Sequence, residues 1–171
     1  MNYELPKLKA EIKIPDSYKP VDNIDINRII SRPDDIGFRE EMLNFYKTNP
    51  KTKLLIDTLN PYSFIMISEI SEYVPIDSNS FYGTIEYERN RSSSSPAVED
   101  STYYVGSKID SVPNFKFLTS KYERKLNGRH RFSHLFIISS KNKTLGISFY
   151  SPTDEKRKVM RYIKTIKERK V

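Results

Sequence analysis

The pattern of apolar and polar residues divides the chain into three stretches of different character. In the first, residues 1–22, apolar and charged residues alternate from Lys7 to Ile14, which predicts an exposed edge strand. Three prolines interrupt this stretch. We therefore expect residues 1–22 to form an extended arm. The arm either joins the protein's own sheet, which is the simpler alternative, or lies over a partner subunit.

The second stretch, residues 23–61, carries apolar residues at the three- and four-residue steps of amphipathic helices. These steps predict one short helix near its beginning, a second over residues 34–48 and a third over residues 51–59. Asn49 and Pro50 suit the start of the third, because proline is favoured at the first helical position. We expect this stretch to consist of two or three short helices.

The third stretch, residues 62–171, is rich in aromatic and β-branched residues that alternate with polar ones. Such alternation is typical of half-buried strands. A hairpin of residues 131–140 and 145–150 is its clearest feature. The other expected elements are strands at residues 62–70, 81–88, 102–109 and 114–118, a flexible serine-rich loop at residues 90–100 and a helical turn at residues 121–126.

The chain's last expected element is a helix that begins at Ser151. Ser-Pro-Thr-Asp fits a helix start, with serine as the cap, proline next and an acid three residues on. Val159, Ile163 and Ile166 follow at helical spacing, so we expect an amphipathic helix of about 17 residues. The fold class is therefore α+β: an N-terminal arm and short helices, then an antiparallel sheet or partly closed barrel capped by this helix.

Charge is divided unevenly along the chain. The net charge is +7, but residues 114–171 hold 16 Lys and Arg against 4 Asp and Glu, whereas residues 1–113 hold 13 against 18. A basic region of this kind predicts contact with a polyanion, which can be nucleic acid, an acidic protein or an anionic membrane surface. The alternative is a solvated basic face that the chain's own acidic part neutralises.

The basic region places candidate binding residues on the hairpin and the last helix, and nearby aromatic residues are candidates for stacking on bases. The candidate nucleic-acid or anion-binding residues are Arg129, Arg131, Lys141, Lys143, Lys156, Arg157, Arg161 and Lys164, and the candidate stacking residues are Tyr103, Tyr104 and Phe132.

The residues needed for metal or cofactor chemistry are scarce. The chain has no Cys, so thiolate nucleophiles and Cys-ligated zinc are excluded, and its 5 Gly form no phosphate-binding loop. His130 and His134 would share one face of a strand, but no third ligand accompanies them. We expect no cofactor, no metal site and no catalytic residue.

Residues 103–107, Tyr-Tyr-Val-Gly-Ser, resemble the second motif of the GIY-YIG nucleases. Gly83-Thr84-Ile85 lies upstream, in the place of the first motif, and Gly128-Arg129-His130 lies downstream, where that family often has a histidine. The resemblance implies tyrosines that act at a scissile phosphate and a metal ligand at Glu155. Because the first motif lacks its tyrosine here, the alternative is a degenerate nuclease.

The order of short antiparallel strands, a hairpin and a closing helix from Tyr62 to Lys170 resembles pleckstrin-homology-like barrels. That resemblance implies binding of phosphoinositides or peptides, with no ligand residue to assign, because the likeness is one of layout alone.

From these observations we expect a non-enzymatic interaction module that is a subunit of a larger assembly. Its basic surface would contact nucleic acid or an acidic partner. No apolar run approaches the roughly 18 residues of a membrane span, and the first residues lack the apolar core of a signal peptide. The expected location is the cytoplasm or the nucleus.

Overall fold

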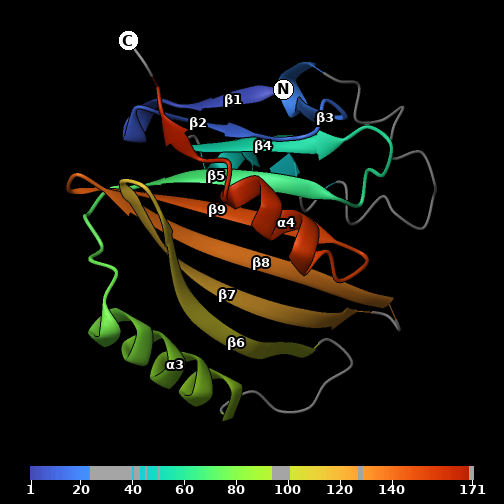
Figure 1. Ribbon diagram of the computed structural model, residues 1–171. Helices are drawn as coiled ribbons and strands as arrows, with labels where there is room; N and C mark the ends of the chain where they lie inside the picture. The colour runs from blue at the N-terminus through green and yellow to red at the C-terminus, as the bar shows by residue number, and fades with distance from the viewer. Residues whose placement is uncertain are drawn as a thin grey trace.

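The computed structural model describes residues 1–23, 40, 43–44, 46–49, 51–93, 101–126 and 129–169. Short strands and 3₁₀ turns come first, and four long strands in succession form most of the second half (Figure 1). The elements are β1 (Asn2–Leu5), η1 (Pro6–Leu8), β2 (Ala10–Lys13), β3 (Tyr18–Pro20), η2 (Val21–Asn23), β4 (Thr52–Asp57), β5 (Phe64–Ile70), α3 (Ser78–Ser93), β6 (Ser101–Val112), β7 (Phe115–Leu126), β8 (Arg129–Ser140), β9 (Lys143–Ser151), α4 (Lys156–Ile163) and β10 (Lys167–Glu168).

The framework is a seven-stranded sheet in the order β3-β4-β5-β9-β8-β7-β6. All its neighbouring strands are antiparallel. The predicted α+β class with a mainly antiparallel sheet is therefore confirmed. The barrel alternative is wrong, because the described strands run from an edge at β3 to an edge at β6 and form an open sheet.

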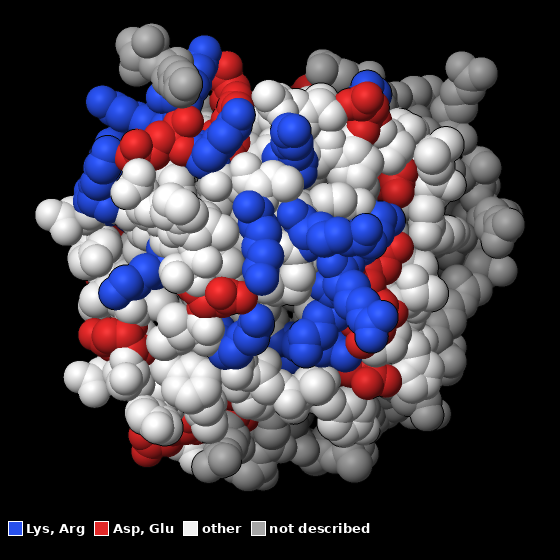
Figure 2. All heavy atoms as spheres, in the orientation of Figure 1, with Lys and Arg blue, Asp and Glu red and all other residues white. Residues whose placement is uncertain are grey.

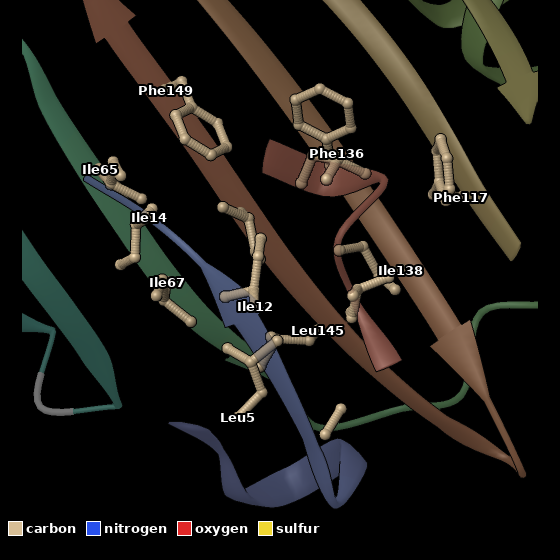
Figure 3. Close-up of a cluster of buried hydrophobic side chains, with 14 of the residues drawn as sticks. Leu5, Ile12, Ile14, Ile65, Ile67, Phe117, Phe136, Ile138, Leu145 and Phe149 are labelled. Carbon is tan, nitrogen blue, oxygen red and sulfur yellow. The ribbon is translucent and has the colours of Figure 1, made fainter. Parts of the chain in front are cut away.

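One face of this sheet is covered by α4 and by a small second sheet of order β1-β2-β10 (Figure 1). Figure 3 shows Leu5 and Ile12 of the small sheet among the side chains of β5, β8 and β9. The centre of this core is Phe136, whose ring packs edge-on against Phe117 and Phe149 at centroid distances of 6.3 and 5.8 Å. The predicted arm thus packs on the protein's own sheet.

The opposite face has a smaller core beside β4 and β5. Leu54 and Ile56 of β4 are buried there with Val21 of η2. Phe64 stacks on Tyr150 with a centroid distance of 4.5 Å and an interplanar angle of 12°. β4 and β5 are therefore covered on both faces, which explains why β4 has three consecutive apolar residues, Leu54, Leu55 and Ile56.

The helix predicted for residues 51–59 is wrong, because this segment contains β4. Leu55 points into the larger core, whereas Leu54 and Ile56 point into the smaller one. A run buried on both faces has neither the period of a half-buried strand nor that of an amphipathic helix. The helix predicted for residues 34–48 lies largely outside the described residues.

The strand predicted for residues 81–88 is also wrong, because these residues lie within α3. Asp77 and Ser80 form a reciprocal cap: Ser80 N–H donates to Asp77 Oδ1 at 2.9 Å, and Asp77 N–H donates to Ser80 Oγ at 3.0 Å. Buried Glu88 accepts a hydrogen bond from Tyr122 Oη at 2.9 Å. Capping and contact with the sheet outweigh the local alternation of aromatic residues.

The strands predicted at residues 62–70 and 102–109 are confirmed as β5 and β6, and the hairpin is confirmed as β8 and β9. The hairpin turn is tighter than expected, since it holds only Lys141 and Asn142, both with positive φ. The helical turn at residues 121–126 is wrong. These residues continue β7, which pairs along its length with β6 and β8.

The C-terminal helix is about half as long as predicted. It covers 8 residues, and Val159 and Ile163 anchor it in the larger core. Ser151 does not cap it but ends β9, while Asp154 Oδ1 accepts from Lys156 N–H at 3.1 Å. After α4 the chain returns to an extended form as β10, which pairs with β2. No helix of the described residues is long and apolar enough to cross a membrane.

Candidate anion-binding surface

Three cationic side chains project from α4 into solvent, and a fourth projects from Lys164, the residue that follows the helix. Lys156, Arg157, Arg161 and Lys164 are exposed, whereas Val159 and Ile163 on the other side are buried. Figure 2 shows Lys and Arg gathered over the region that α4 occupies in Figure 1. The amphipathic pattern of this short helix therefore produces a basic surface.

Lysines from β6 and β7 extend this surface through shared carboxylates. Asp110 lies 3.0 Å from Lys108 Nζ and 3.8 Å from Lys164 Nζ. Asp154 Oδ2 lies 2.5 Å from Lys121 Nζ. We define the α4 surface as Lys108, Lys121, Lys156, Arg157, Lys158, Arg161 and Lys164, together with the carboxylates Asp110, Asp154 and Glu155.

The cations of the α4 surface are only partly neutralised. Glu155 pairs with Lys158 at 3.1 Å, and the other two carboxylates are engaged as described above. Lys156, Arg157 and Arg161 form no ion pair with any carboxylate of the described residues. The surface therefore has an excess of positive charge.

A buried histidine lies directly beneath the start of this surface. The side chain of His134 is 2% exposed, and its Nε2 lies 3.3 Å from Asp154 Oδ1 without the alignment of a regular hydrogen bond. Lys121 Nζ binds the other oxygen of the same carboxylate. Asp154 therefore links the buried imidazole to the exposed cations.

The pKa values of this group follow from burial and charge. Desolvation lowers the pKa of His134 below 6.5, Lys121 and Lys156 lower it further, and Asp154 opposes them in part. Burial opposes ionisation of Asp154, but hydrogen bonds from Lys121 Nζ and the Lys156 backbone outweigh it and hold its pKa below 3.8. At neutral pH the imidazole is neutral and the carboxylate is ionised.

We expect the free energy of unfolding to fall between pH 7 and pH 5 because of His134. Its pKa is depressed only in the folded state, so the unfolded chain takes up the proton first as the pH falls through 6.5. Urea denaturation at several pH values measures the fall, and His134→Gln should make the curve flatter in this range. The control His130→Gln should leave the His134-dependent fall in place. If the free energy of unfolding of His134→Gln fell between pH 7 and pH 5 as much as that of the wild type, His134 would not be the cause of the fall.

The candidate residues on the hairpin do not join the α4 surface. Lys141 and Lys143 lie at the β8–β9 turn, at the opposite end of β9 from the connection to α4, and Lys141 pairs with Glu168 at 2.5 Å. Arg131 is on the opposite face of the sheet, 5.3 Å from the ring centroid of Tyr62. The side chain of Arg129 lies outside the described part of the chain. Sequence proximity thus grouped residues that the strands separate.

The three candidate stacking residues are divided between the two faces of the sheet, with Tyr103 and Phe132 on one face and Tyr104 on the other. Phe132 lies beneath Lys121, whose Nζ is 5.4 Å from the ring centroid. Tyr104 is on the opposite face, where its hydroxyl donates to Ser107 Oγ at 2.7 Å. Tyr103 is 55% exposed on the edge strand β6. They form no common stacking platform.

The residues implied by the nuclease resemblance are not close to one another. Tyr104 shares a sheet face with Tyr122, which contacts α3, whereas Glu155 precedes α4 on the other face. Gly83 lies in α3 instead of beside β6 in the sheet. Across the described residues, no group of three or more His, Asp or Glu is placed to hold a metal ion.

Sequence reasoning missed the contribution of β6 and β7 to the surface. The pattern of the sequence assigns no binding role to Lys108, Lys121 or Asp110. It predicts Asp154 only as part of a helix cap. The available signal was strand alternation, because Lys108 and Asp110 share one side of β6. Their meeting with α4 depends on how the helix packs across the sheet.

Comparison with known proteins identifies the architecture. No protein-family model and no curated protein matches the sequence. The fold is similar to that of cyanobacterial PsbP (CyanoP) from Synechocystis sp. PCC 6803, with a TM-score of 0.53 and 11% identity over 99% of this chain and 92% of that one. A crystal structure from Bacteroides thetaiotaomicron VPI-5482 gives a TM-score of 0.53 and 14% identity over 99% of this chain and 48% of that one, so this chain spans about half the length of that protein. These similarities show the fold alone.

Proposed function

We propose that this protein is a non-enzymatic binding module, and a subunit of a larger assembly, whose α4 surface contacts an acidic region of a partner protein. The observation that carries the proposal is the set of three exposed cations, Lys156, Arg157 and Arg161, that no described carboxylate neutralises. Such a surface attracts an oppositely charged partner and orients it during encounter.

The composition of the surface favours an acidic protein over nucleic acid. Carboxylates of Asp110, Asp154 and Glu155 are interspersed among the cations, and they would repel a continuous phosphate backbone. A protein surface with both charges can match such a mixed pattern. Of the predicted stacking residues, Phe132 lies beneath Lys121 and Tyr103 is on the same face of the sheet with Glu123 between them, whereas Tyr104 is on the opposite face, so the three rings form no continuous row for stacking bases.

The helix α4 itself carries no exposed side chain of the kind that inserts into a lipid interface. The exposed large apolar residues of the described chain lie on other elements, and none is on α4. An anionic membrane could therefore be attracted only by charge. We accordingly treat lipid and nucleic acid as outcomes of the experiment below.

We expect Arg157→Ala/Arg161→Ala to weaken binding to a glutamate-rich peptide about tenfold, since each lost interfacial charge typically costs about 0.5–1 kcal/mol. Fluorescence anisotropy of a labelled peptide at 50 and 200 mM NaCl measures the effect, and higher salt should weaken the wild-type complex. Lys141→Ala/Lys143→Ala removes the same charge at the β8–β9 turn and should bind like the wild type.

Parallel titrations with duplex DNA, single-stranded RNA and phosphatidylserine vesicles test the alternatives. Each should bind more weakly than the peptide at 200 mM NaCl. Tighter binding of any of these three ligands, with the same loss in Arg157→Ala/Arg161→Ala, would replace the acidic protein with that ligand. If Lys141→Ala/Lys143→Ala lost as much peptide affinity as Arg157→Ala/Arg161→Ala, binding would depend on the net charge of the protein alone. That result would overturn the proposed role of the α4 surface.

A further inference from the structure

A second site lies away from α4, between the small sheet and one end of the large one. A cavity of about 580 Å³ opens there, which is within the range of about 300–1,000 Å³ typical of small-molecule pockets. Its roof is formed by β1 and η1, including Tyr3 and Pro6, and its floor by β4, β5 and β9. We call this cavity the β1–β4 slot.

Strand register explains why the floor changes from polar to apolar across the slot. Lys53 pairs with Ile67, and Glu69 pairs with Leu145, so these four side chains face the small sheet in two rows. The residues toward the β4 edge are charged and exposed, whereas Ile67 and Leu145 deeper in are buried. Figure 3 shows Leu5 of the roof close to Leu145 of the floor.

The slot opens at the edge of the large sheet because the neighbouring strand is short. β3 pairs only with Leu55–Asp57 of β4. No described strand pairs with the other side of β4 from Thr52 to Leu54. The mouth of the slot is therefore at Lys51 and Lys53, and a ligand can enter without opening the sheet.

The charges at the mouth favour an anion. Lys7, Lys51 and Lys53 line the slot with two carboxylates, Glu4 and Glu69. Glu4 already lies 2.9 Å from Arg169 Nη1, and Lys7 Nζ donates to the carbonyl of Ile70. Lys51 and Lys53 make no ion pair with described carboxylates, so they remain available to a ligand.

We propose that the β1–β4 slot binds a small amphipathic carboxylate, such as a medium-chain fatty acid. Its apolar tail lies between the roof at Tyr3 and Pro6 and the floor at Ile67 and Leu145. Its carboxylate lies at the mouth, within reach of Lys51 and Lys53. Burial of the tail supplies affinity and the two lysines supply selectivity for the anion. This site is separate from the α4 surface and does not depend on its function.

The test is displacement of a dansyl-labelled undecanoic acid by decanoate, followed by dansyl fluorescence with the full chain. We expect saturable binding with one probe per chain and displacement by decanoate below its micellar range. Decanol, which has the tail without the charge, should compete at least tenfold more weakly. Equal competition by decanol, or no saturable probe binding, would overturn the proposal.

Variants at the mouth test the role of the lysines. Lys51→Ala/Lys53→Ala alters two exposed side chains and should weaken decanoate about tenfold while leaving decanol unchanged. Arg157→Ala/Arg161→Ala, which removes the same charge from α4, is the matched control and should bind decanoate normally. Wild-type affinity in the slot variant, or an equal loss in the control, would refute recognition by these lysines. Circular dichroism of each variant confirms that the fold is kept.

Discussion

Replacing Phe136 with alanine should lower the free energy of unfolding by about 3–5 kcal/mol, the usual cost of removing a buried aromatic side chain. Phe136 is 0% exposed and lies at the centre of the larger core. Its ring contacts Phe117 and Phe149 in two edge-on pairs. The sheet backbone on both sides holds the resulting cavity open, because β8 is paired with β7 and β9 over most of its length.

Urea denaturation followed by far-ultraviolet circular dichroism measures this loss. Tyr87→Ala is the control, because that side chain on α3 is more than half exposed and its removal should change the stability by no more than about 0.5 kcal/mol. A loss below about 1 kcal/mol for Phe136→Ala would mean that the packing between β7, β8 and β9 differs from that described.

Replacing Ile163 with alanine should have two consequences. Ile163 is fully buried and attaches α4 to the sheet together with Val159. The stability should fall by about 2–5 kcal/mol, as for other large-to-small changes in a core. Because the same helix carries Arg157 and Arg161, weaker attachment should also reduce binding of the glutamate-rich peptide under conditions in which the protein remains folded.

The neighbouring change Lys164→Ala separates these two effects. Lys164 is exposed on the outer side of α4, 3.8 Å from Asp110. Its removal should reduce peptide binding modestly and leave the stability within about 0.5 kcal/mol of the wild type. If Ile163→Ala kept full peptide affinity despite its loss of stability, α4 would not need its observed position to bind.

The elements that were predicted correctly are those in which local pattern and tertiary environment agree. The β8–β9 hairpin alternates apolar and polar residues and has a turn at Lys141 and Asn142, so each strand has the period that its burial requires. β4 was mistaken for a helix because its two faces enter different cores. α3 was mistaken for a strand because the alternation at residues 81–88 concealed the cap formed by Asp77 and Ser80.

The placement of the candidate residues in the fold was predicted in part. Lys156, Arg157, Arg161 and Lys164 were assigned to one helix; the first three are exposed on α4, and Lys164 is exposed directly after its end. The hairpin cations were grouped with them because they are near in sequence. Strand alternation places Arg131 on the other face, and the length of β9 places Lys143 at the far end of the sheet. The β1–β4 slot left no recognisable signal, because its residues come from four separate segments.

The amino-acid sequence by itself determined the charge division and the strands whose alternation is regular. These properties depend on residues a few positions apart, so they can be derived from local spacing. Only the tertiary structure decided that the large sheet is open, that Asp154 joins His134 to Lys121, and that β1 lies over β4 and β5. These features depend on contacts between segments that are far apart in the sequence. The strand order that brings the segments together depends on how much apolar side-chain surface the whole fold buries, and local spacing does not reveal that.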